Sequence, residues 1–294
     1  MKIAILADIH ANYQALSQTS KYCEKLGINK VWFLGDIVGR GPEPQKCIKW
    51  LMSNVDRTDK TSWIIGNHEV LLLKLLPKEI YIQLSVNSKY MIPKHLEEIQ
   101  TDQEIWVFVH KNFTISRTEA VIKIIDGVNH ILTHGGLKDF PNYPYLYPWE
   151  DSRRFKFQIA EAIRIFNTVK PSIIWFGHTH VPTLISIGLI NSSLNVQTTK
   201  VVPGETYTLD PNKWWIINPG SIGYSRNLDP KAFFIVLDTL SLNIIFVRVD
   251  YDLSKTMHLM EINNYPKKLL EIISSADMDE MPYEWVEHFN KVKF

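Results

Sequence analysis

The chain has 294 residues, of which 45% are hydrophobic and 21% are charged, and its formal net charge is +1. This composition is typical of a soluble globular protein, and the near-neutral charge gives no indication of a nucleic-acid or membrane surface. No apolar run reaches the ~18 residues that a membrane-spanning helix needs. Asp8 and His10 interrupt the place where the apolar part of a signal peptide would lie. Cys23 and Cys47 suggest neither a disulfide framework nor a thiolate metal site, so we expect a cytoplasmic protein.

The first third of the chain alternates short apolar runs with helical patterns. Strands are predicted at residues 2–6, 31–34 and 62–65. Helices are predicted at 12–26, with Asn12 as the N-cap, and at about 44–53. Strands that alternate with helices in this way imply parallel pairing with right-handed crossovers.

The pattern changes between about residues 70 and 112, where four consecutive segments look helical and only the last is ambiguous. We interpret residues 1–294 as a single domain with a helical cap inserted at about 70–112. The alternative, which the residues leave open, is that these segments are further peripheral helices.

The second half of the chain is rich in strands. Strands are predicted at 121–125, 130–133 and 172–176, a helix at about 152–169, and a β-rich region from about 182 to 249. Within that region we predict a long loop through 205–213, and from Asp252 the chain again looks helical.

Five of the predicted strands end in a motif that contains Asp, Asn or His. The motifs are DIH, GDIVGRG and GNHE after the first three strands, and HGG and GHTH after two later ones. Since the carboxyl ends of strands in an open α/β sheet share one crevice, these motifs can converge. The candidate metal ligands that they supply are Asp8, His10, Asp36, Asn67, His134, His178 and His180.

Carboxylates, imidazoles and a carboxamide oxygen together indicate a site for divalent metals, and no thiolate is among them. Seven candidate ligands are too many for one ion and about right for two, since a shared carboxylate can bridge ions ~3.5–4 Å apart. We therefore expect two divalent cations, with Mn as the first candidate and Fe, Zn, Ni or Co as the others.

The five motifs in this order resemble those of the calcineurin-like metallophosphoesterase superfamily. The similarity is greatest to its compact prokaryotic phosphodiesterase branch, which opens with a DIHGN-type motif. NPGSIG at residues 218–223 and RVDYD at 248–252 also resemble that branch, and only about 71–129 and 191–213 match loosely. The resemblance implies an α/β fold, a four-layer α/β/β/α sandwich of two mixed sheets flanked by helices.

The resemblance also assigns each candidate ligand to an ion. It places Asp8, His10 and His180 on one metal, Asn67, His134 and His178 on the other, and Asp36 on both. By the same resemblance His68 is not a ligand but faces the substrate as a general acid or charge stabiliser, and Arg40 binds phosphate. The alternatives are an extra metal contact or structural role for His68 and a solvated loop arginine for Arg40.

Two residues depart from the pattern of the superfamily. Ala11 stands where the family usually has Gly. Gly39 stands where protein phosphatases have an Asp that pairs with the histidine equivalent to His68, so the partner of His68 is open.

The activity that the resemblance implies is hydrolysis of phosphate esters, with phosphodiesters favoured over monoesters, by in-line attack of a metal-bridging hydroxide. Alternatives are a phosphomonoesterase or protein phosphatase, and a hydrolase of dinucleoside polyphosphates or cyclic nucleotides. An alternative of another class is a catalytically silent scaffold with the same fold, which the filled ligand positions disfavour.

The expected partner is a small-molecule phosphate ester or nucleotide, without a stable nucleic-acid partner or a membrane, and exposed C-terminal strands could pair in a homo-oligomer. The loop at 140–149 carries four aromatic residues that are candidates for a base- or ring-stacking wall, namely Tyr143, Tyr145, Tyr147 and Trp149. Trp214 and Trp215 are expected in the core. The remaining histidines are expected to be structural, namely His95, His110, His130, His258 and His288.

Overall fold

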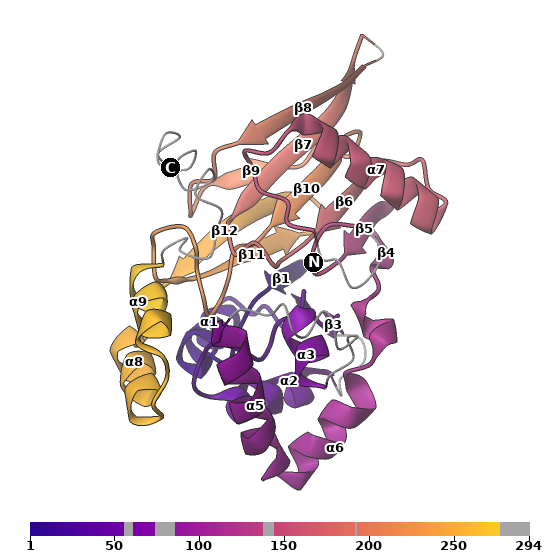
Figure 1. Ribbon diagram of the computed structural model, residues 1–294. Helices are drawn as coiled ribbons and strands as arrows, with labels where there is room; N and C mark the ends of the chain where they lie inside the picture. The colour runs from indigo at the N-terminus through magenta and orange to yellow at the C-terminus, as the bar shows by residue number, and fades with distance from the viewer. Residues whose placement is uncertain (56–60, 74–85, 138–143, 192, 277–294) are drawn as a thin grey trace.

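The computed structural model describes residues 1–55, 61–73, 86–137, 144–191 and 193–276. Two six-stranded sheets pack face to face in this part of the chain (Figure 1). The first sheet has the spatial order β3 (Thr61–Trp63), β2 (Val31–Phe33), β1 (Lys2–Leu6), β11 (Ala232–Asp238), β12 (Asn243–Val249) and β9 (Thr206–Thr208). The second has the order β4 (Val121–Ile125), β5 (Val128–Leu132), β6 (Ser172–Trp175), β10 (Trp214–Asn218), β7 (Thr183–Ile190) and β8 (Ser193–Thr199).

Both sheets are mixed, and each has a parallel part that matters for the site. In the first sheet β1, β2 and β3 pair in parallel, as the sequence predicts, whereas β1 pairs antiparallel with β11. In the second sheet β5, β6 and β10 pair in parallel. The carboxyl ends of β1, β2 and β3, and those of β5 and β6, therefore each lie at one edge of their sheet.

Alternating side chains of the central strands divide the core into layers. Ile3 and Ile5 of β1 pack between the two sheets, whereas Ala4 and Leu6 face the helices on the outer side. A strand that is apolar on both faces can be buried in the middle of such a sandwich. Trp214 and Trp215 behave in the same way, because the first packs under α7 and the second between the sheets.

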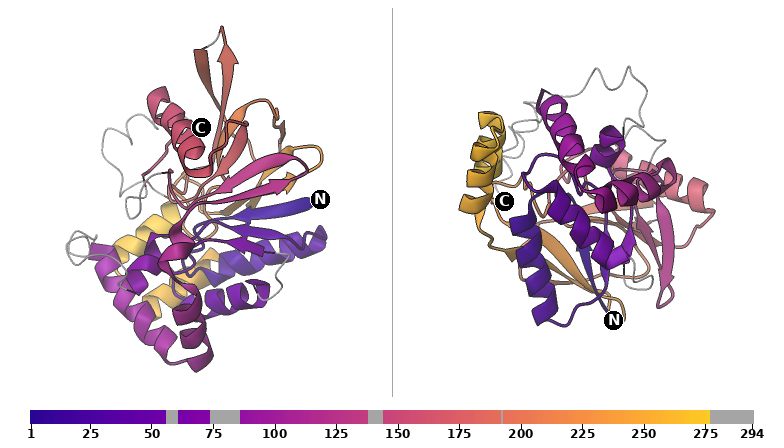
Figure 2. Two further views of the ribbon diagram at one scale, coloured as in Figure 1. Left: turned by 90° about the vertical axis from the view of Figure 1, so that its right-hand side faces the viewer. Right: turned by 90° about the horizontal axis from the view of Figure 1, so that it is seen from below.

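Helices cover the outer faces of the sheets, which confirms the α/β/β/α fold class. Their bounds are α1 (Tyr13–Lys25), α2 (Pro44–Val55), α3 (Asn67–Leu72), α5 (Val86–Gln100), α6 (Gln103–Asn112), the 3₁₀ helix η1 (Ile115–Thr118), α7 (Ser152–Phe166), α8 (Leu253–Ile262) and α9 (Lys267–Ser275). In the side view α7 lies on one side of the pair of sheets, and α1, α2, α8 and α9 lie on the other (Figure 2, left). None of the helices in the described ranges combines the length and apolar character that a bilayer crossing requires.

The region predicted to be an inserted cap contains α3, α5 and α6, while residues 74–85 lie outside the described part. Helix α5 packs against α2, α3 and α6. The treatment of this region as an insertion into one domain stays a prediction. The ambiguous last segment, residues 103–109, lies within helix α6, and the Asp102 side chain accepts hydrogen bonds from the first turn of that helix.

The predicted loop at 205–213 is wrong in part, because it contains β9. This strand of three residues pairs antiparallel with β12, where Tyr207 lies opposite Ile244. It pairs with a strand more than 30 residues away, so the local pattern gave no signal for it.

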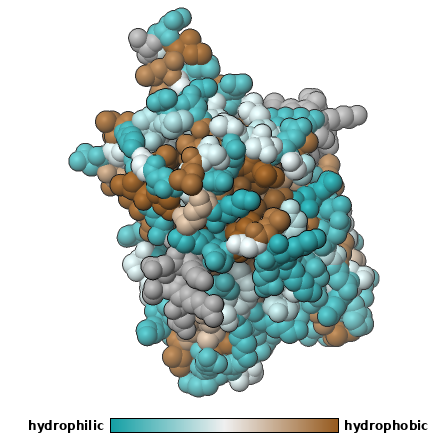
Figure 3. All heavy atoms as spheres, turned by 180° about the vertical axis from the view of Figure 1, so that it is seen from behind, coloured by the Kyte–Doolittle hydropathy of each residue, from teal (hydrophilic) through white to brown (hydrophobic). Residues whose placement is uncertain are grey.

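Seen from behind, hydrophilic residues cover most of the lower, helical half, and hydrophobic residues gather over the upper half, up to the tip of the β7–β8 hairpin (Figure 3). Leu189 and Ile190 lie at this tip and are 73% and 57% exposed. Strand pairing between two copies of the chain stays a prediction.

Candidate metal centre

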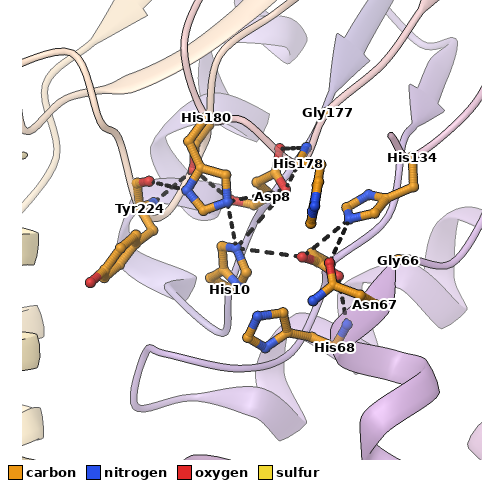
Figure 4. Close-up of polar contacts among 12 residues, drawn as sticks. Asp8, His10, Gly66, Asn67, His68, His134, Gly177, His178, His180 and Tyr224 are labelled. Carbon is orange, nitrogen blue, oxygen red and sulfur yellow. Dashed lines mark hydrogen bonds and ion pairs between the residues drawn. The ribbon is translucent and has the colours of Figure 1, made fainter. Parts of the chain in front are cut away.

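The motifs that follow β1, β2, β3, β5 and β6 converge between the two sheets (Figure 4). Six candidate ligands form two groups that share Asp36, and within each group one ligand atom from every residue lies within 4.8 Å of the others. The groups are Asp8, His10, Asp36 and His180, and Asp36, His134 and His178, all buried. Asn67 joins the second group, because its Oδ1 lies 3.0 Å from Nε2 of His134.

Several of these side chains are held by unusual backbone conformations. Asp8, His10, Asp36, His178 and His180 all have positive φ, between 47° and 66°. For residues other than glycine this left-handed conformation is uncommon and costs on the order of 1–3 kcal/mol, and it persists only where the surrounding structure enforces it. Such strain gathered in one place is typical of a functional site.

Glu69, the last residue of the GNHE motif, supplies part of that enforcement. Its buried carboxylate accepts hydrogen bonds from the backbone N–H groups of Asp36, Val38 and Gly66, at 2.8–3.0 Å. One side chain at the start of α3 thus ties together the turns that follow β2 and β3. Glu69 has no role in the prediction from the sequence, although its place beside His68 in the motif is a signal.

Backbone carbonyls fix the orientation of three of the histidines. Nδ1 of His10 lies 3.1 Å from the Val38 carbonyl oxygen, and Nδ1 of His180 lies 2.6 Å from that of Tyr224. His134 makes the same contact with Leu34 at 2.7 Å. Because a carbonyl only accepts, each Nδ1 carries a proton, and each ring therefore turns its Nε2 toward the centre.

These lone pairs face one another in a way that favours a cation between them. The Nε2 atoms of His10 and His180 lie 3.0 Å apart. Burial, together with nearby positive groups, lowers the pKa of both imidazoles well below the usual value, so neither Nε2 carries a proton. Two acceptors in contact repel unless a positive ion shares them, and Oδ1 of Asp8 lies 3.4 Å from Nε2 of His180. The donor set therefore fits a metal ion.

The second group carries a proton where a metal would bind. Burial opposes charge on Asp36, but the neighbouring His134 and His68 hold its pKa well below the usual range. Burial likewise opposes charge on His134, yet the carboxylate of Asp36 raises its pKa to about 9. Nε2 of His134 lies 3.3 Å from Oδ2 of Asp36. A divalent cation would replace this proton and neutralise the same carboxylate.

Comparison with known proteins identifies the family. The family model described as calcineurin-like phosphoesterase matches residues 1–182. This chain belongs to the calcineurin-like phosphoesterase family. It is therefore a phosphoric ester hydrolase of a metal-dependent family, as the motifs predict.

Three relatives of this phosphoesterase illustrate the similarity. An uncharacterized protein of Methanocaldococcus jannaschii is 29% identical over 274 residues, which is 92% of this chain and 96% of that protein. A symmetrical bis(5'-nucleosyl)-tetraphosphatase of Buchnera aphidicola is 33% identical over 76 residues, 25% of this chain and 26% of that protein. The crystal structure of a metallophosphoesterase from Sphaerobacter thermophilus has the same fold, with a TM-score of 0.68, 23% identity, and coverage of 94% of this chain and 100% of that one.

His68 of the phosphoesterase lies beside the candidate ligands and belongs to neither group. Its backbone N–H donates to Oδ1 of Asp36 at 2.9 Å, and its ring lies edge-on to that of His10, with 4.7 Å between centroids. Gly39 packs directly on the ring, since a Cβ at this position would lie 2.0 Å from Nδ1 of His68. Any side chain at position 39 would overlap His68, which explains on steric grounds why glycine and not aspartate stands there.

Arg40 is only 8% exposed, so it is not a solvated loop arginine. Its guanidinium carbon lies 4.4 Å from the centre of the Tyr224 ring, and Tyr224 in turn packs against the rings of His10 and His180. Burial is the main cause of the lowered pKa of His180, and the charges of Arg226 and Arg40 lower it further. Arg40 therefore lies at the centre that the five motifs form.

The aromatic loop forms a stack on the candidate centre. The ring of Tyr145 stacks on His178 at 4.1 Å and 15°, Tyr147 on Tyr145 at 5.5 Å and 13°, and Trp149 on Tyr147 at 5.0 Å and 13°. Tyr143 lies outside the described residues, as does His288. Tyr145 therefore links the stack to the candidate ligand His178.

Two further residues at the site were missed by the sequence analysis. Arg226 is 3% exposed and hydrogen-bonds the Tyr147 hydroxyl. Its positive charge favours the ionised form of Asp8 and the neutral form of His180, in addition to the larger effect of burial on both groups. It follows the NPGSIG motif by three residues, which was an available signal. His95 hydrogen-bonds the turn that carries Arg40, and its helix gave no signal.

Proposed function

We propose that this chain hydrolyses phosphate esters, preferably phosphodiesters, at a centre of two divalent cations. The observation that carries the proposal is the pair of ligand groups that share Asp36, with the unprotonated Nε2 atoms of His10 and His180 in contact. Asp8, His10 and His180 would hold one ion, Asn67, His134 and His178 the other, and Asp36 both. The filled ligand set argues against a silent scaffold. The preference for diesters rests on the resemblance to the prokaryotic branch.

Two bound cations would supply an activated water and positive charge for the phosphoryl oxygens. Mn is the first candidate, since the nitrogen and oxygen donors contain no sulfur.

The residues of the chain supply the remaining parts of the reaction. The buried guanidinium of Arg40 stabilises negative charge on the phosphoryl oxygens, held in place by its contact with Tyr224. His68 is the general acid, because among the described histidines beside the centre it is the one that lies outside both ligand groups. It donates a proton to the leaving oxygen, a contribution of ~10²–10⁴ in rate for a well-placed acid.

The test is hydrolysis of bis(p-nitrophenyl) phosphate and p-nitrophenyl phosphate by the purified protein, with Mn or with chelator. We expect Mn-dependent turnover that favours the diester, and a kcat lower by ~10²–10⁴ in His68→Ala. His110→Ala is the matched control, because His110 is an exposed histidine on α6 that contacts Trp106 of its own helix. Turnover that survives the chelator, or a His68→Ala variant as fast as His110→Ala, would contradict the proposal. A preference for the monoester would make the enzyme a phosphomonoesterase.

A second candidate function is hydrolysis of a nucleotide, such as a dinucleoside polyphosphate or a cyclic nucleotide. A hollow of about 500 Å³ lies beside Tyr145, on the chain segment that leads from the candidate centre into α7, and Phe157, Arg153 and Arg154 also line it. Tyr145 and Phe157 are 39% and 46% exposed. Aromatic rings and guanidinium groups are suited to a base and to phosphate oxygens, respectively. The similarity of one segment to a bis(5'-nucleosyl)-tetraphosphatase agrees with this candidate.

The two candidates predict different effects of Phe157→Ala. For a nucleotide hydrolase we expect diadenosine tetraphosphate to be a better substrate than the chromogenic diester, and Phe157→Ala to lower kcat/KM for the dinucleotide alone. Equal effects on both substrates would reject the hollow as a nucleotide site.

A further inference from the structure

His95 joins a remote helix to the turn that follows β2. It lies on α5 and is fully buried. Its Nδ1 accepts a hydrogen bond from the backbone N–H of Gly39 at 3.1 Å, and its Nε2 lies 2.9 Å from the carbonyl oxygen of Gly41. Since Nδ1 accepts, the proton is on Nε2, and one neutral ring satisfies the backbone on both sides of Arg40. Burial lowers the pKa of His95 to about 3, which keeps this tautomer neutral.

Tyr265 supports the same turn from another part of the chain. It lies between α8 and α9, and its hydroxyl donates to the Gly41 carbonyl at 3.0 Å and lies 3.3 Å from Nε2 of His95. Gly41 is 54 residues from His95 and 224 from Tyr265 along the chain. Two segments outside the five motifs thus meet at one carbonyl.

The turn itself, residues 39–41, needs such support. Gly39 and Arg40 have φ of +86° and +63°, in the left-handed region. The backbone of Gly39 forms the surface on which the ring of His68 rests, and the next residue carries the guanidinium of Arg40. A displacement of this turn would move both groups together.

We propose that His95 is a positioning residue, which acts through the 39–41 turn to hold Arg40 and His68 against the substrate. The proposal rests on the proposed function, in which these two groups face the phosphate ester. It gives α5, in the region predicted as an insertion, a role in substrate binding and in protonation of the leaving group. Tyr265 also supports the turn, but only at Gly41. His95 binds both Gly39 and Gly41, so we expect it to contribute more to the position of the turn than Tyr265 does.

The variants His95→Leu, His95→Asn and Tyr265→Phe test this role. His95→Leu keeps the approximate bulk and removes both hydrogen bonds. His95→Asn retains an oxygen acceptor near the position of Nδ1, and Tyr265→Phe removes one of two donors to Gly41. The matched control is His130→Leu, the same change at a histidine that is also fully buried but packs between Trp32 and Trp175 in the core.

We expect His95→Leu to lower kcat by ~10–100-fold and to raise KM for the diester, since a displacement of about 1 Å at an active site costs ~10²-fold. His95→Asn should recover part of that loss, and Tyr265→Phe should lie within about threefold of wild type. Bound Mn should stay at the wild-type amount in all of them. His130→Leu should lose stability without a change in kcat or KM.

Hydrogen exchange at the Gly39 amide gives a readout that does not need turnover. This N–H donates to His95, so its protection should fall at least tenfold in His95→Leu and stay unchanged in His130→Leu. If the wild type is active and His95→Leu has the same kcat and KM as His130→Leu, this proposal is overturned and the proposed function stays intact. A wild type that turns over no phosphate ester would overturn the proposed function instead. If His95→Leu does not fold, His95→Asn decides the question. Wild-type kcat and KM in His95→Asn, together with loss of protection at the Gly39 amide, would equally reject the positioning role of His95.

Discussion

The contact between Gly39 and His68 makes Gly39→Ala a direct test of the proposed role of His68 as general acid. A Cβ on Gly39 would lie 2.0 Å from Nδ1 of His68, and 2.8 and 2.9 Å from the next two ring atoms. Real Cβ contacts essentially never fall below 3.0 Å, so the ring must move by at least 3.0 − 2.0 = 1.0 Å, or the turn must move instead. Either movement separates His68 from its position beside His10.

The expected loss follows from that displacement. Misplacement of a reacting group by about 1 Å costs ~10²-fold in rate, and complete loss of a general acid costs ~10²–10⁴-fold. We therefore expect kcat for the diester to fall by ~10²–10⁴, which corresponds to about 3–5 kcal/mol in the activation barrier. Bound Mn should stay at the wild-type level, because position 39 supplies no candidate ligand.

Gly127→Ala is the matched control. Gly127 has a similar φ of +79° and lies in the turn between β4 and β5, and no atom of the described residues would lie within 4 Å of a new Cβ there. Alanine at such a φ costs ~1–2 kcal/mol. Urea unfolding should show this loss of stability in Gly127→Ala, while steady-state kinetics show an unchanged kcat. A Gly39→Ala enzyme within about threefold of the control in kcat would refute the assigned position of His68.

Three further predictions follow from the same structure. Asp36→Asn should lower bound Mn from two ions per chain to one or none and abolish turnover, and elemental analysis that finds two ions in the variant would contradict a shared carboxylate. Tyr145→Ala should weaken Mn binding by ~10–100-fold because it frees the ring of His178, whereas Tyr145→Phe should not; calorimetric titrations that give equal affinities would show that the stack has no part in metal binding. Burial lowers the pKa of His130 to about 4, below the 6.5 of an unperturbed histidine, so between these pH values the unfolded chain binds the extra proton. The contribution of His130 to the free energy of unfolding is therefore complete above about pH 6.5 and falls as the pH falls, by about 2 kcal/mol at pH 5. Urea titrations should show that His130→Gln loses correspondingly less stability than wild type between pH 8 and 5.

Local patterns predicted the parts of the fold that local chemistry determines. Asn12 was predicted as an N-cap, and its side chain accepts from the backbone N–H of Ala15 at 3.2 Å. The same side chain donates to the carbonyl of Gly223 and so ties the β1 turn to the NPGSIG motif. No pattern near Asn12 indicates this second contact, because it depends on how β11 pairs with β1.

The candidate ligands were predictable because each lies at a strand end within a compact motif. Glycine, a short polar side chain and an apolar run occur within a few residues of one another, so the motif is visible without the fold. The two-layer arrangement that brings five strand ends together came from the family resemblance. The sequence alone indicated only that parallel strands end on one side.

The residues that were missed act across long separations. His95 looked structural because its helix carries no motif, and its contact with Gly39 exists only once α5 packs over the turn after β2. Similarly, the sequence marked Tyr145, Tyr147 and Trp149 as candidates for a stacking wall, whereas the contact with His178 depends on the course of the loop after β5. Side chains that position a site need not lie near its motifs in the sequence.

The central claim is a centre of two divalent ions that share Asp36, and anomalous diffraction from manganese-soaked crystals tests it most directly. We expect two anomalous peaks, one in contact with Asp8, His10 and His180 and the other with Asn67, His134 and His178. A single peak, or no peak among these residues, would contradict it.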